Sequence, residues 1–83
     1  MYAVALTATL PVPNPESRHE ELLFSMSRVG LRDLRVRPLA DGKMLVTCSL
    51  NAEDEAAAMS HVVGEALEVF PSLKVLEISA VGS

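Results

Sequence analysis

The stretch NAEDEAAAMSHVVGEALEVF, residues 51–70, decides how this chain folds. At about 100° per residue its apolar side chains fall on one broad face of a helix. Asn51 is a good N-cap, acidic residues 53–55 suit the positive end of the helix dipole, and Pro71 cannot continue the helix. The pattern predicts an amphipathic helix over residues 51–70 that needs a sheet to cover it. Its apolar face comprises Ala52, Ala56, Met59, Val62, Val63, Ala66, Leu67, Val69 and Phe70.

Four other segments alternate with a period of two, which is typical of β-strands. They span residues 2–10, 33–38, 44–50 and 73–81. The last segment contains two alternating sets: Leu76, Ile78 and Ala80, which we expect to face the helices, and Val75, Glu77, Ser79 and Val81.

A second helix is predicted between the first two strands. Asn14-Pro15 is typical of an N-cap followed by the first helical residue, and Gly30 suits the left-handed position that ends a helix. Phe24 falls on the polar face of this helix. Its apolar face comprises Leu22, Leu23, Met26 and Val29. Because the strip Ala57, Ser60 and Gly64 on the later helix is small, we expect the two helices to approach closely there.

The turn between the second and third strands sets their register. A two-residue turn would pair Val36 with Thr47 and put the apolar faces out of step, because a one-residue slip reverses every side chain. A three-residue loop over residues 40–42, with Gly42 left-handed, pairs Val36 with Val46. We expect the three-residue loop.

The resulting order, βαββαβ, predicts one α+β domain over residues 1–83. It resembles the ferredoxin-like arrangement, a four-stranded antiparallel sheet in the order 4-1-3-2 with two helices on one face. The resemblance is to the fold and not to a family. The Met-x-Cys-x-x-Cys loop of heavy-metal chaperones is missing, and small residues replace the aromatic residues of RNA-recognition motifs on the two central strands.

Composition limits the classes of function. No apolar run approaches the roughly 18 residues that a membrane span needs, and no basic segment precedes residues 2–10 as it would in a signal peptide. We therefore expect a cytoplasmic protein. The single cysteine, Cys48, alternates with Val46 and Leu50 toward the core, which argues against a disulfide or a cysteine-rich metal site. No catalytic constellation, cofactor motif or metal-ligand set stands out, so we expect a binding module rather than an enzyme.

Charge is unevenly distributed within the net −4. Residues 1–43 contain six basic and five acidic residues, whereas residues 44–83 contain one basic and six acidic residues. The arginines of the first half are the densest group of charges, and we predict that they form a binding surface for an acidic protein or an anionic small ligand. Nucleic acid is not the expected partner, because the net charge is negative and no aromatic stacking platform is present. The alternative is that arginines keep an edge strand soluble. The predicted partner-binding residues are Phe24, Arg28, Arg32, Arg35 and Arg37.

The sheet face away from the helices is small or apolar and largely uncharged, so we predict that a second copy of the chain covers it. Pairing through the edge of the last strand is the alternative, because that strand has few charges and no proline. In a two-fold contact between faces, Glu77 of one subunit would approach Arg35 or Arg37 of the other. The predicted interface residues are Thr7, Leu45, Thr47, Val75, Glu77 and Val81.

The leading interpretation is a non-catalytic interaction or regulatory module that acts as a homo-oligomer. One alternative is a dimeric α+β-barrel enzyme whose two sheets enclose a small-molecule pocket. Another is an ACT-like domain that binds a small ligand at a subunit interface, although residues 10–14 lack the glycine usual in ACT domains.

Overall fold

The computed structural model describes residues 1–11, 19–27 and 30–82. The predicted start of the first helix at Asn14-Pro15 and its residues 28–29 lie outside this range. The elements in chain order are β1 (Tyr2–Thr9), α1 (His19–Ser27), β2 (Arg32–Pro38), the short 3-10 turn η2 (Ala40–Gly42), β3 (Lys43–Leu50), α2 (Glu55–Val69) and β4 (Lys74–Gly82).

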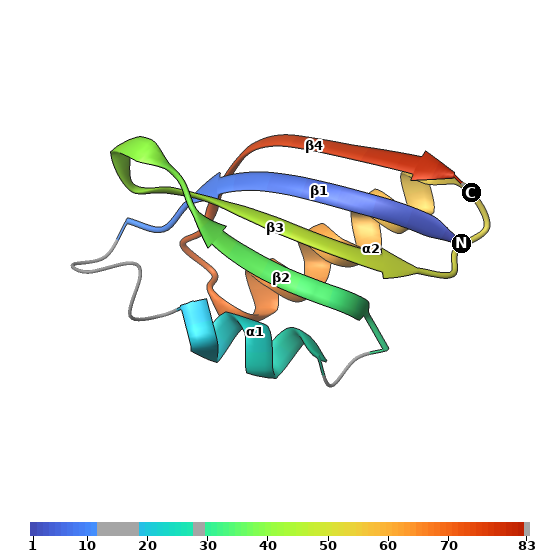
Figure 1. The fold of residues 1–83 in the computed structure, drawn as a ribbon, viewed down its shortest axis with the longest axis horizontal. Helices are drawn as coiled ribbons and strands as arrows, with labels where there is room; N and C mark the ends of the chain where they lie inside the picture. Colours follow the sequence, from blue (N-terminus) through green and yellow to red (C-terminus); the bar gives the residue numbers. More distant parts are fainter. Residues whose placement is uncertain (12–18, 28–29, 83) are drawn as a thin grey trace.

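The four strands form one antiparallel sheet in the order β2-β3-β1-β4, which confirms the predicted order. Figure 1 shows the sheet as one layer with both helices on the same side of it. Helix α2 lies against β1 and β4, and α1 lies beside β2. Among the described residues, no element covers the other side of the sheet. We call that side the open face.

The core lies between the sheet and the helices. Residues at even positions are buried from Val4 onward in β1 and from Met44 onward in β3, while most of their odd neighbours on the open face are partly exposed. Leu6 and Val46 from the central strands meet Leu22 and Met26 of α1 and Val62 of α2, and all five are fully buried. Truncating a buried leucine to alanine typically costs about 2–5 kcal/mol, so these contacts hold the two layers together.

Helix α2 begins later than its sequence predicts. Its N-cap is Asp54 and not Asn51: the Asp54 Oδ1 accepts a hydrogen bond of 2.7 Å from the Ala57 N–H. Both residue types cap helices well, so the choice depends on tertiary structure. After β3 ends at Leu50, the chain needs several residues to turn from the sheet into the helix layer. Ala58, which the predicted face omitted, is buried in the core, and Ala56, which that face included, is exposed.

The hairpin between β2 and β3 has the predicted register, because Val36 pairs with Val46. Its three-residue loop is η2, and Gly42 has the expected positive φ of 72°. Asp41 is also left-handed, with φ 61°. The Leu39 N–H closes the loop with a 2.8 Å hydrogen bond to the Lys43 carbonyl.

A β-bulge near the start of β4 overturns part of the predicted pattern. Thr7 pairs with Glu77 and Ala8 pairs with Val75, so Leu76 is an extra residue with no partner of its own. Beyond such a bulge the alternation of side chains changes phase. Val75 therefore packs against the core, contrary to its predicted place on the open face, and Leu76 is 43% exposed. From Glu77 onward the predicted alternation holds.

The outer surfaces of the helices also differ from expectation. A Cβ added at Gly64 would meet nothing within 4 Å, so the close approach predicted at this glycine is wrong. Leu23, predicted to face the core, is 36% exposed, because Leu22 and Met26 take the buried positions of α1. Within the described residues, no helix is long and apolar enough to cross a membrane.

Candidate functional site

The open face presents small, mostly uncharged side chains at its centre. Strand alternation places Ala5 and Thr7 of β1 on this face, together with Leu45 and Thr47 of β3. All four are partly exposed. Val81 of β4, on the same face, is 66% exposed. Among the residues of the two central strands, Lys43 at the start of β3 is the one charged residue on this face.

The pairing register arranges the open face in rows that cross all four strands. The row with charge at both ends, which we call the charged row, consists of Arg37, Leu45, Thr7 and Glu77. The neighbouring row consists of Arg35, Thr47, Ala5 and Ser79, and the one beyond it of Arg32, Ser49, Ala3 and Val81. Each of these rows has an arginine at the β2 edge, but the charged row alone among them ends in a carboxylate.

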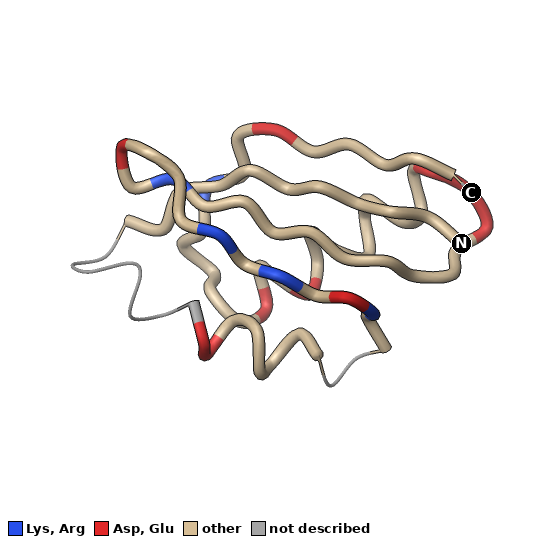
Figure 2. The backbone as a smooth tube through the Cα atoms, viewed as in Figure 1, with Lys and Arg blue, Asp and Glu red and all other residues tan. Residues whose placement is uncertain are grey.

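Basic side chains follow the β2 edge. Figure 2 marks basic positions along the backbone of β2, with one acidic position among them, and an acidic position on β4. Arg32, Arg35 and Arg37 are all exposed. Arg28 lies outside the described residues. Phe24 is 66% exposed, but it belongs to α1 in the helix layer and not to the open face. Of the predicted partner-binding residues that the structure describes, Phe24 therefore lies in a different layer from the three arginines.

A second β-bulge shapes the β2 edge. Between the pairs Arg32–Ser49 and Arg35–Thr47, two residues of β2 face one residue of β3, and Asp33 has a positive φ of 51°. Aspartate is among the few residues other than glycine that adopt this left-handed conformation readily. The sequence contained one weak signal for this bulge, an aspartate at the start of an otherwise alternating strand.

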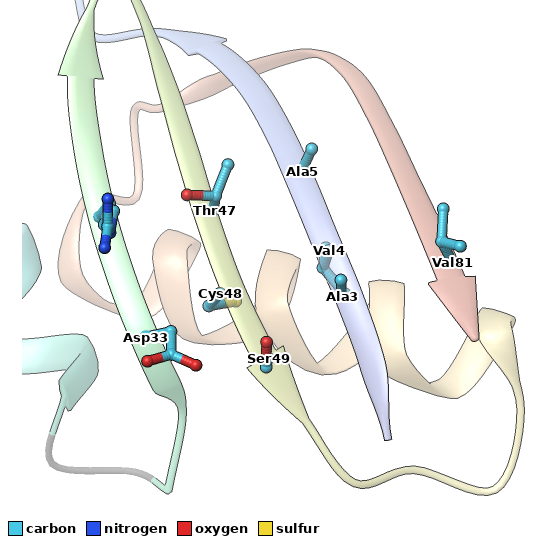
Figure 3. Close-up of a pocket in the computed structure, with 9 residues that line it drawn as sticks. Ala3, Val4, Ala5, Asp33, Thr47, Cys48, Ser49 and Val81 are labelled. Atoms are coloured by element: carbon cyan, nitrogen blue, oxygen red, sulfur yellow. The ribbon is translucent and has the colours of Figure 1, made fainter. Parts of the chain in front are cut away.

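A shallow concavity of about 470 Å³ lies on the open face beside this bulge (Figure 3). Small alanine and serine side chains form the floor of this concavity. The Thr47 and Ser49 side chains lie on the same side of β3 (Figure 3). Asp33 and Arg35 border it on β2, and Val81 borders it on β4. One carboxylate, one guanidinium and two hydroxyls can hydrogen-bond a docked surface. The lining residues are Ala3, Val4, Ala5, Asp33, Arg35, Thr47, Cys48, Ser49 and Val81.

Cys48 faces the core, as predicted. It is 4% exposed, and desolvation by burial raises the pKa of its thiol to about 11. A thiol with this pKa stays protonated at neutral pH and is a poor nucleophile. Among the described residues, no three histidine, cysteine, aspartate or glutamate side chains come together as a metal site would require.

The interface residues predicted from the sequence fall mainly on the open face. Thr7, Leu45 and Thr47 occupy its centre, and Glu77 and Val81 lie on β4 at its border. Val75 is the exception, because the β4 bulge turns it toward the core.

Comparison of the sequence with protein-family models and with curated proteins finds no match to either.

Proposed function

We propose that this chain is a non-catalytic interaction module with a ferredoxin-like fold that self-associates through the open face of its sheet. The observation that carries the proposal is the uncharged centre of this face. Partly exposed Leu45, Thr7 and Thr47 lie there, and Val81 on the same face is exposed. Burial of apolar area stabilises association, and small uncharged side chains allow two sheets to pack closely.

The condition of the sheet edges favours contact between faces over pairing of edges. Bulges and charged residues protect edge strands from pairing with another chain. The β2 edge has both, with the bulge at Asp33 and exposed Arg35 and Arg37. The β4 edge has the bulge at Leu76, which shortens its regular part. Both edge strands are therefore interrupted by a bulge, which disfavours pairing with a strand of another chain.

Introducing one charge at the centre of the open face tests the proposal. Thr47→Glu places a carboxylate where two packed faces would exclude water, and an unpaired buried charge strongly opposes association. Ser60→Glu is the matched control, since Ser60 is exposed on α2 and belongs to the other layer. Light scattering at micromolar concentration should give a dimer for the parental chain and for Ser60→Glu, and a monomer for Thr47→Glu. A dimer that survives Thr47→Glu would assign the contact to another surface.

A further inference from the structure

We infer that the second copy binds with the two-fold axis parallel to the strands, so that Glu77 of each subunit meets Arg37 of the other. This inference rests on the proposed self-association through the open face. It adds the orientation of the partner and the residues that determine this orientation.

The charged row carries opposite charges at its two ends. Arg37 lies at the β2 edge and Glu77 at the β4 edge, with Leu45 and Thr7 between them. Three strand spacings, about 14 Å, separate the two backbone positions. In the part of the chain that the structure describes, neither side chain has an ion-pair partner. The sheet therefore presents a positive and a negative edge at the same level along the strands.

Two orientations of a two-fold axis keep the strands of two facing sheets aligned. An axis parallel to the strands places β2 over β4 of the other subunit and β3 over β1. An axis across the strands places β2 over β2, which brings the exposed arginines of both subunits together. Facing charges of like sign oppose association, and facing charges of opposite sign favour it. The charges therefore select the parallel axis.

The middle of the charged row fits the same orientation. With β3 over β1, Leu45 of each subunit faces Thr7 of the other, so that the larger side chain lies against the smaller one. In the neighbouring row, Thr47 faces Ala5 in the same way. Protein interiors and interface cores pack at high density, which this pairing of large with small residues allows.

The usual geometry of packed sheets is compatible with the Arg37–Glu77 contact. Aligned sheets lie about 10 Å apart and cross at about 30°, which shifts the outermost strands relative to each other by about one residue. The long side chains of arginine and glutamate can absorb such a shift. Arg32 lies two rows from Arg37, about 13 Å along the strand, and stays out of reach of Glu77.

The size of the open face agrees with this contact. A standard interface buries about 800 Å² per partner. That is about one-sixth of the 5076 Å² that the chain exposes. The flat area of one face of a four-stranded sheet with strands of about eight residues is about 500 Å², and the side chains that project from it add to the area that a contact can bury.

Charge reversal with mixing tests the inference. Arg37→Glu alone and Glu77→Arg alone each place like charges at both ends of the interface, so each should dissociate at least about tenfold more readily than the parental chain. An equimolar mixture restores both opposite-charge contacts and should form a heterodimer, which native mass spectrometry resolves by mass. The chain with both substitutions should again form a homodimer. Arg32→Glu makes the same change in net charge and is the control: it should remain a homodimer and should not capture Glu77→Arg.

The outcomes separate this inference from the proposed function. If the parental chain is a dimer but the Arg37→Glu and Glu77→Arg variants do not form a heterodimer, the orientation is wrong and self-association stands. If the parental chain is a monomer, the proposed function fails and the inference fails with it.

Discussion

Replacing Leu6 with alanine tests which face of the sheet carries the core. Leu6 is fully buried on the central strand β1, where Val46 and Ile78 pair with it on either side. Truncation at such a site removes the transfer energy of the lost methyl groups and leaves a cavity, for a total of about 3–5 kcal/mol. The stability of an 83-residue chain is about 4–12 kcal/mol. The melting temperature should therefore fall by about 12–40 °C.

The neighbouring substitution Thr7→Ala is the matched control, because Thr7 lies on the same strand with its side chain on the open face. Urea denaturation followed by circular dichroism gives the free energy of unfolding of each variant. Measurements at several protein concentrations separate the contribution of self-association. At the lowest concentration Thr7→Ala should cost less than about 1 kcal/mol. A Thr7→Ala loss as large as that of Leu6→Ala would show that the two faces are assigned the wrong way round.

Four further experiments probe three separate parts of the structure. A thiol reagent should label Cys48 slowly in the native protein at pH 8 and rapidly in the unfolded chain, because burial raises the pKa of the Cys48 thiol to about 11. Rapid labelling of the native protein would place the Cys48 side chain on the open face. Because the Cys48 thiol loses its proton at a lower pH in the unfolded chain than in the folded chain, the free energy of unfolding should fall as the pH rises from 9 to about 11. Cys48→Ala should remove this contribution to the fall. Gly64→Ala should raise the free energy of unfolding by about 1 kcal/mol in thermal or urea denaturation, because the added Cβ meets nothing within 4 Å; a decrease would reveal a close neighbour. Arg35→Glu combined with Arg37→Glu should change the free energy of unfolding of the monomer by less than about 1 kcal/mol, since both side chains are exposed, and collapse of the fold would mean that they are structural.

The fold is largely predictable because its signals are local and consistent with one another. The alternation in β1 and β3 identifies their buried residues, and the three-residue loop ending at Gly42 predicts the pairing of Val36 with Val46. The errors arise where local preference permits two answers. Asn51 and Asp54 are both good N-caps, and the path from the sheet to the helix layer selects Asp54. Nothing in the sequence around Leu76 marks a bulge, since it contains neither glycine nor proline.

The candidate site was predictable in composition but not in arrangement. The period of two places Thr7, Leu45 and Thr47 away from the core. The row that joins Arg37 to Glu77 depends on three pairing registers and on the bulge at Leu76. The sequence alone left open whether Arg35 or Arg37 would meet Glu77, because register between distant strands depends on contacts that no local pattern encodes.

Sedimentation equilibrium of the parental chain at micromolar concentration measures whether the chain self-associates. Self-association through the open face predicts a mass twice the 8.9 kDa of a single chain, falling to 8.9 kDa for Thr47→Glu. A mass of 8.9 kDa for the parental chain would mean that the chain does not self-associate.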